Sequence, residues 1–215
     1  MTTNIVIVPG YHGSGDAHWQ SWLQRELPQA KRVSGIDWEQ PILSQWADAI
    51  VRELDATTSK TIIVAHSFGC LATARALATR AQCVTGVLLV APADPERFDA
   101  QGSRNNRFTA SVAHLLPEVS LHTQGLVIGS RNDPWMKLQH AYAWSKRWGL
   151  DFHDAGNVGH INTDSGFGPW PLIKLLTQTL CVSEQPRNSL VQLQRINFPI
   201  NYRLAPSRTT QLLYA

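Results

Sequence analysis

One serine lies in a sequence context that is typical of an activated nucleophile. Ser67 is the centre of Ala65-His66-Ser67-Phe68-Gly69, which follows a β-branched run and precedes an alanine-rich stretch. A sharp strand-to-helix turn that exposes a serine needs small residues two positions before and two positions after it. Gly69 fits this need, and Ala65 adds one methyl group to the commoner glycine. The flanking strand and helix patterns favour a nucleophile over the alternative, a serine that only caps a helix.

A serine hydroxyl is a poor nucleophile at neutral pH, so it needs a base beside it and a carboxylate that orients the base. After a turn of this type, the acid and then the histidine follow the serine along the chain. His160 lies in a glycine-containing loop after a late predicted strand, and Asp133 follows the strand before it. We predict that His160 is the general base and Asp133 the acid. Asp94, which follows an earlier strand, stays open as the alternative acid.

Acyl transfer also needs two donors for the oxyanion that develops on the substrate. We expect one to be the backbone N–H of Phe68, and the other the N–H of Tyr11 in the loop Gly10-Tyr11-His12-Gly13-Ser14-Gly15. The competing interpretation of that loop is a phosphate or dinucleotide site. Its glycine spacing differs from both nucleotide-binding patterns, and it contains no lysine, so nucleotide binding is disfavoured.

Alternating elements must position these residues. Short β-branched runs predict buried strands at residues 5–8, 61–65, 84–90, 126–129 and 150–153, with a further strand at 32–36. Apolar residues at helical spacing predict one helix that Asp16 caps and that carries residues 19–27, and others at 42–54, 70–80, 108–116, 134–148 and 170–181. Because a helix returns the chain between parallel strands, this alternation predicts an α/β fold, a three-layer sandwich with a mostly parallel central sheet.

The segment between the predicted strands at 84–90 and 126–129 is too short for a large cap domain. An open cleft is therefore expected. Tyr11, Phe68, Trp135 and Trp170 are the candidates for its apolar rim, with Trp135 and Trp170 as the predicted substrate-binding residues.

Charge and composition exclude several classes of partner. The 215 residues carry a formal charge of +3, and residues 184–215 account for all of it with four arginines against one glutamate. The neutral remainder has no basic face for a phosphate backbone, so no nucleic-acid partner is expected. Neither the three cysteines nor the eight histidines show metal-ligand spacing, so no metal and no cofactor are expected.

The chain also lacks the patterns that would place it at a membrane. No apolar run is long enough to span a bilayer, and no basic region precedes the first apolar run as in a signal peptide. We therefore expect no membrane partner and a cytoplasmic protein.

The combined pattern resembles the small serine hydrolase family of YdeN and the retinoblastoma-binding serine hydrolase, in the α/β-hydrolase superfamily. The resemblance rests on Ile5-Val6-Ile7-Val8-Pro9-Gly10 with its loop and Trp19, and on Thr61-Ile62-Ile63-Val64-Ala65-His66-Ser67-Phe68-Gly69. Asp133-Pro134-Trp135 and Gly159-His160 continue it. These motifs are specific in combination and ordinary singly.

This resemblance covers about residues 4–181. It implies a compact α/β-hydrolase fold without a large cap domain and a triad at Ser67, Asp133 and His160. We divide the chain into a hydrolase domain, 1–183, and an appended tail, 184–215, that lies outside the family pattern and is expected to be loosely ordered.

The sequence thus predicts a serine hydrolase that cleaves small or exposed carboxylic ester or amide substrates through a covalent acyl-enzyme. The alternative is a protein-binding module on a hydrolase scaffold, with the tail or the tryptophan-rich surface as its contact site. A protein partner is compatible with the sequence but not indicated by it. The complete set of Ser67, Asp133 and His160 argues against the binding module, because a protein without catalysis has no reason to retain all three in order.

Overall fold

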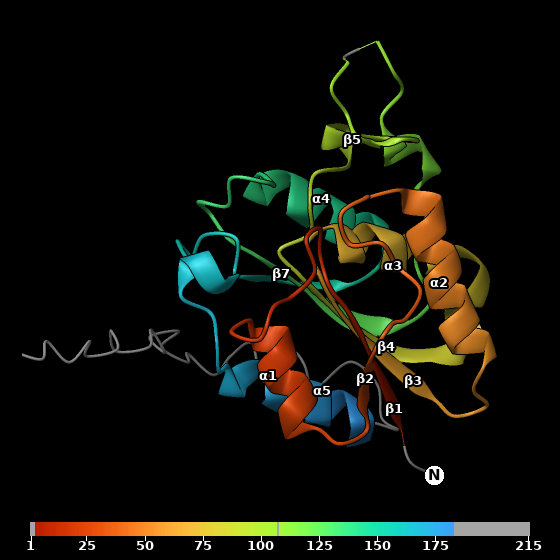
Figure 1. The fold of residues 1–215 in the computed structure, drawn as a ribbon, viewed down its shortest axis with the longest axis vertical. Coiled ribbons are helices and arrows are strands. Elements are labelled where there is room, and N and C mark those ends of the chain that lie inside the picture. The colour runs from red at the N-terminus through yellow and green to blue at the C-terminus, as the bar shows by residue number, and fades with distance from the viewer. Residues whose placement is uncertain (1–2, 107, 183–215) are drawn as a thin grey trace, which may run out of the picture.

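The computed structural model of the chain describes residues 3–106 and 108–182. Six parallel strands form one sheet in the order β2-β1-β3-β4-β7-β8 (Figure 1). The strands are β1 (Asn4–Val8), β2 (Ala30–Arg32), β3 (Thr61–His66), β4 (Val84–Val90), β7 (Gln124–Gly129) and β8 (Asp151–Asp154). The predicted parallel sheet is therefore confirmed.

Successive residues of each strand point to opposite faces of the sheet, so the apolar strands supply two cores. In β1, Ile5 and Ile7 belong to one core, and Val6 and Val8 belong to the other. Figure 1 shows α1 and α5 on the first face and the remaining helices on the second. The helices are α1 (Trp19–Glu26), α2 (Leu43–Asp55), α3 (Phe68–Arg80), α4 (Leu138–Arg147) and α5 (Pro171–Val182). This is the predicted three-layer α/β sandwich.

A small excursion connects β4 to β7 and extends away from the sheet (Figure 1). It contains a two-stranded antiparallel hairpin between two short 3-10 turns. Its elements are η2 (Pro95–Arg97), β5 (Phe98–Asp99), β6 (Gly102–Ser103) and η3 (Val112–Leu115). Two further 3-10 turns lie elsewhere, η1 (Ala81–Cys83) and η4 (Thr163–Ser165). Within the described part of the chain the excursion adds no large cap, as predicted.

The start of α1 differs from the prediction that Asp16 caps this helix. A turn in which the His18 N–H donates to the Gly15 carbonyl delays the helix to Trp19. His18 is the residue that caps it, and its Nδ1 accepts the N–H of Gln20 at 3.1 Å. Asp16 is exposed and lies outside the helix.

Two other predicted helices are shorter in the structure because aspartate and asparagine side chains bond to nearby backbone N–H groups. Asn106 accepts the N–H of Phe108, and only the short turn η3 forms in the predicted helix 108–116. Asp133 accepts the N–H of Trp135, and α4 begins only at residue 138. Such local bonds compete with the helical pattern of hydrogen bonds.

One strand is displaced relative to the prediction, and one segment lies outside the structure described. Strand β2 comprises residues 30–32, which pair with Ile5 to Ile7. It therefore begins two positions before residue 32, where the predicted strand starts. The appended segment 184–215 falls outside the described residues.

None of the described helices is long and apolar enough to cross a membrane.

The first turn of α3 lies directly against the end of β1, which brings the predicted nucleophile turn beside the glycine-rich loop. This approach requires a glycine. A Cβ atom at Gly69 would lie 2.7 Å from the carbonyl oxygen of Val8 and closer still to that of Pro9. Because backbone oxygens cannot be moved aside like a flexible side chain, the turn admits no side chain at this position.

We predict that Gly69→Ala lowers the free energy of unfolding by about 1–3 kcal/mol, the usual cost of overpacking a well-packed site. Urea unfolding of the full chain measures the change. Gly15→Ala is the matched control, since a Cβ there would meet nothing within 4 Å. Equal stabilities of the two variants would contradict the proposed contact.

Candidate active site

Three side chains meet where the strands of the sheet end. Ser67 follows β3, Asp133 lies in the loop after β7, and His160 lies in the loop after β8. The carboxyl ends of parallel strands face the same edge of the sheet, which is where α/β proteins collect their functional groups. The structure therefore brings together all three residues that the sequence singled out.

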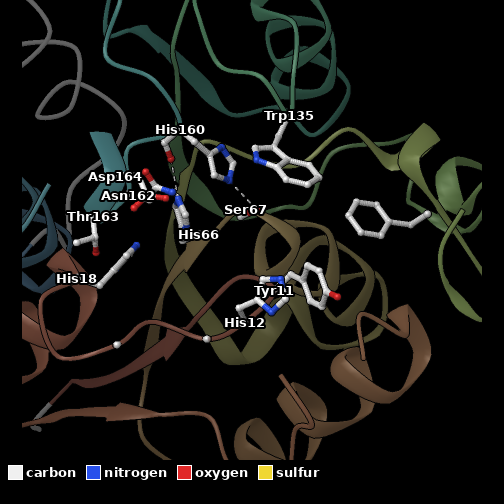
Figure 2. Close-up of a pocket in the computed structure, with 13 residues that line it drawn as sticks. Tyr11, His12, His18, His66, Ser67, Trp135, His160, Asn162, Thr163 and Asp164 are labelled. Carbon is white, nitrogen blue, oxygen red and sulfur yellow. Dashed lines mark hydrogen bonds between the residues drawn. The ribbon is translucent and has the colours of Figure 1, made fainter. Parts of the chain in front are cut away.

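The three side chains form a continuous hydrogen-bonded chain. The Oγ of Ser67 lies 2.9 Å from Nε2 of His160 (Figure 2), and Nδ1 of the same ring lies 2.9 Å from both carboxylate oxygens of Asp133. The Asp133 side chain is 2% exposed and that of His160 is 9% exposed. A carboxylate can only accept here, so His160 carries its hydrogen on Nδ1, and Nε2 is free to accept the Ser67 hydroxyl hydrogen.

Asp94, the alternative acid, points elsewhere. One of its carboxylate oxygens accepts the N–H of Glu96, and the other lies 3.3 Å from Nδ1 of His140 on the protein surface. Asp94 therefore makes no hydrogen bond to His160, and Asp133 occupies the position beside that ring.

The backbone of Ser67 is strained. Its φ and ψ angles are 53° and −124°, and non-glycine residues with such positive φ values typically cost about 1–3 kcal/mol. Its N–H donates to the carbonyl of Val90 at 3.0 Å, which anchors the turn to β4. The strained turn ends β3, begins α3 and leaves the hydroxyl at the edge of a cavity.

Two hydrogen bonds hold the His160 loop on its N-terminal side. The N–H of Gly159 donates to Oδ1 of Asn132 at 2.7 Å, and the N–H of His160 donates to Oγ of Ser165 at 3.0 Å. Asn132 is next to Asp133, so the same loop after β7 anchors the histidine backbone and orients its ring.

Two more bonds hold the loop on the other side, and both come from residues that the sequence analysis did not assign to the site. Nε2–H of His66 donates to the carbonyl of His160 at 2.9 Å (Figure 2), and the indole N–H of Trp19 donates to the carbonyl of Ile161 at 2.8 Å. Ile161 has a φ of 50°, an outlying value for a β-branched residue. These bonds stabilise a conformation that the loop would not adopt alone.

The glycine-rich loop after β1 lies beside the serine. A Cβ at Gly10 would be 2.7 Å from Cβ of Ser67, so only glycine allows this approach. The loop is fixed by bonds from the Gly13 N–H to the Gly10 carbonyl and from the His12 N–H to the Trp38 carbonyl, both 2.9 Å. Within the described chain, the N–H of Tyr11 makes no such bond. Phe68 begins α3, so its N–H has no partner inside the helix.

A cavity of about 360 Å³ opens above Ser67. Its two ends differ in chemistry (Figure 2). Tyr11 and Trp135 line one end, and the Arg97 guanidinium lies 4.6 Å from the centre of the Trp135 ring. The other end is polar and is lined by His18, Asn162, Thr163 and Asp164.

Two of the predicted rim residues are not on this cavity. Trp170, a predicted substrate-binding residue, is 5% exposed and packs edge-on against Trp19 in the core between α1 and α5, away from the lining of this cavity. The side chain of Phe68 is fully buried against Trp46 in the opposite core. Phe98, which the sequence analysis did not assign to the cleft, is one of the residues that line this cavity.

Burial makes two neighbouring histidines electrically neutral. It lowers the pKa of His18 from 6.5 to about 4, and electrostatic interactions with Arg32 and His160 act in the same direction. Burial, and then electrostatic interactions with His160 and His18, hold the pKa of His66 well below its usual value, although its bond to the His160 carbonyl opposes the shift. Neither ring therefore adds positive charge beside His160 at neutral pH.

The described residues include no group of three His, Cys, Asp or Glu side chains arranged to hold a metal ion. The hydrogen-bonded set of Ser67, His160 and Asp133 is an arrangement that can activate a hydroxyl by proton transfer.

Comparisons with known proteins relate this chain to hydrolases. The model of the family described as serine hydrolase matches residues 5–178. The crystal structure of a YdeN-like hydrolase from Pectobacterium atrosepticum superposes on this chain with a TM-score of 0.71. The two proteins share 33% sequence identity, and the match covers 84% of this chain and 93% of the other. YdeN of Bacillus subtilis (strain 168) is 26% identical over 180 residues, which are 80% of this chain and 93% of YdeN. Est1E from Butyrivibrio proteoclasticus, solved with ferulic acid, shares the fold at 15% identity, a TM-score of 0.56, and coverage of 84% and 86%.

The neutral state of His18 predicts a pH-dependent stability. The unfolded chain takes up a proton at this residue near pH 6.5, whereas the folded chain does so only near pH 4, so acid favours the unfolded state across that window. From pH 7 to pH 5, the wild type should lose about 2 kcal/mol more unfolding free energy than His18→Asn, which cannot titrate. Urea unfolding at both pH values measures this difference, and equal losses in the two proteins would refute it.

Proposed function

Because this chain belongs to the serine hydrolase family, we propose that it hydrolyses small or exposed carboxylic esters or amides through a covalent acyl-enzyme. Ser67 is the nucleophile, His160 the general base and Asp133 the residue that orients the base. One observation carries the proposal: Ser67 Oγ lies 2.9 Å from a histidine nitrogen whose partner nitrogen is bonded to a buried carboxylate. Serine nucleophiles are activated in this way.

In the first half of the reaction, Nε2 of His160 takes the proton of Ser67 as Oγ bonds to the substrate carbonyl carbon. The electron pair of the carbonyl moves to its oxygen, which accepts hydrogen bonds from the N–H groups of Tyr11 and Phe68. When the tetrahedral intermediate collapses, the bond to the leaving group breaks. The leaving alcohol or amine receives the proton from His160.

In the second half, water takes the place of the serine hydroxyl. His160 accepts a proton from the water molecule while the water oxygen attacks the acyl carbon. His160 then returns that proton to Ser67 Oγ as the acid product leaves. Asp133 stabilises the imidazolium in both halves. The neutral His18 and His66, whose rings lie 5.0 Å apart, add no competing positive charge when His160 is protonated.

The cavity supports a small substrate. Its volume of about 360 Å³ is near the lower end for small-molecule sites, and its Trp135 and Phe98 walls suit an apolar group. Esters, amides and thioesters differ at the leaving group, and all three use the same serine chemistry.

The test is covalent labelling of the purified full chain with a fluorophosphonate probe, which reacts with activated serines. We predict stoichiometric labelling of the wild type, and none of Ser67→Ala or His160→Ala, with unchanged circular dichroism. A folded wild type that does not react with the probe or turn over esters would contradict the proposal. A protein-binding module on a hydrolase scaffold would then be the better account.

We also predict that Asp133→Asn lowers kcat for an activated ester by up to about ten-thousand-fold, since the histidine loses both its orientation and the countercharge for its imidazolium. Asp94→Asn is the matched control, because Asp94 contacts the surface residue His140 and not His160. Steady-state kinetics on both variants measure the effect. A larger loss of kcat in Asp94→Asn than in Asp133→Asn would show that Asp94, and not Asp133, is the acid.

A further inference from the structure

The polar end of the cavity contains a hydrogen-bond donor that the triad does not use. His18 is 5% exposed and lines this end together with His66 and Asn162. Figure 2 shows its ring directed toward the side of the cavity where these residues lie. The reaction described above assigns no task to this ring.

The capping bond of α1 fixes which nitrogen of His18 carries the hydrogen. Nδ1 accepts the backbone N–H of Gln20 at 3.1 Å, so Nδ1 bears no hydrogen. In the neutral ring the hydrogen must then be on Nε2. Within residues 3–106 and 108–182, this Nε2–H has no hydrogen-bond partner. It is a donor of fixed direction on the wall of the cavity.

Asn162 supplies a second donor at the same end. Its Oδ1 accepts both the N–H and the Oγ–H of Ser165, at 3.1 and 2.9 Å. Because a backbone N–H requires an acceptor, the oxygen of this amide must face Ser165. The NH₂ group is then the part of the amide that remains available to bind an occupant of the cavity. Two neutral groups therefore offer donors rather than acceptors to whatever occupies this end.

The charge at this end limits what such an occupant can be. Asp164 is exposed and lines the same end of the cavity. Its carboxylate disfavours an anionic group such as a second carboxylate or a phosphate. Two neutral donors beside one negative charge suit an uncharged acceptor oxygen.

We propose that His18 is a substrate-binding residue whose Nε2–H, together with the amide of Asn162, binds an uncharged acceptor oxygen of the substrate, such as an ether or an amide carbonyl. The proposal rests on the proposed function of Ser67. The preferred substrate is then an ester or amide with an apolar group toward Trp135 and a neutral oxygen a few bonds from the scissile carbonyl on the opposite side.

Two pairs of isosteric esters test this inference, because the oxygen can belong to the acyl part or to the alcohol part. The acyl pair is 4-nitrophenyl pentanoate and 4-nitrophenyl 3-methoxypropanoate, followed by nitrophenolate release. The alcohol pair is butyl acetate and 2-methoxyethyl acetate, followed by acid release at constant pH. In each pair one methylene is replaced by oxygen, and the ratio of the two kcat/KM values reports the contribution of that oxygen.

Three variants separate the donor from the cap. His18→Asn retains a good N-cap residue but has no donor at the Nε2 position, and His18→Gln places an amide nitrogen near that position. His122→Asn is the matched control, since His122 lies by the amino ends of β7 and β8, away from Ser67. If His18→Asn does not fold, His18→Gln is compared with His18→Met, which has a similar length and no donor.

We expect the wild type and His122→Asn to prefer the ether by about three- to tenfold in at least one pair, the usual effect of one neutral hydrogen bond. His18→Asn, or His18→Met in its place, should lose that preference while it still hydrolyses the apolar ester, and His18→Gln should retain part of it. An ether preference that is absent in the wild type, or unchanged in the variant without a donor, would overturn the role of His18. A wild type that hydrolyses none of the four esters and does not label would overturn the proposed function instead.

Discussion

The hydrogen bond between Ser67 and His160 is the interaction on which the rest of the site depends, and it joins residues 93 positions apart. The sheet brings both to one edge, but strand order alone does not set a distance of 2.9 Å. His66, the neighbour of the serine, holds the carbonyl of the histidine, and Trp19 holds the next carbonyl. The nucleophile turn is thus bonded directly to the loop that carries its base, so a shift in one displaces the other.

Backbone strain accumulates at the same edge. Non-glycine residues with positive φ include Ser67, Ile161 and the cavity residue His12. Each such conformation costs about 1–3 kcal/mol and persists only where the surroundings determine it. Here the two cores of fully buried strand residues and the buried indole of Trp19 hold the strained backbone in place. The cost is offset by packing elsewhere, and the gain is a hydroxyl and an imidazole that need no rearrangement to meet.

Sequence patterns predicted the sheet well because both faces of its strands are buried, and such strands read as β-branched runs. Helix ends were predicted less well, because the side chains of Asp133 and Asn106 accept hydrogen bonds from nearby backbone N–H groups. The sequence does not show which hydrogen bonds a short polar side chain makes. The order serine, acid, histidine along the chain fits both Asp133 and Asp94, and the position of Asp133 just before the last predicted strand favoured it. The folded geometry separates the two, because Asp94 lies beside a different histidine. The role of His66 could not be read from sequence, because its partner lies 94 residues away.

The central claim is that Ser67 carries the acyl group during turnover. Rapid acid quenching of the wild type while it hydrolyses 4-nitrophenyl pentanoate, followed by peptide mass spectrometry, tests this claim most directly. The account predicts a pentanoyl group on the peptide that contains Ser67, present during turnover and gone once the substrate is consumed. A pentanoyl group on another residue during turnover, or undiminished turnover by Ser67→Ala, would contradict it.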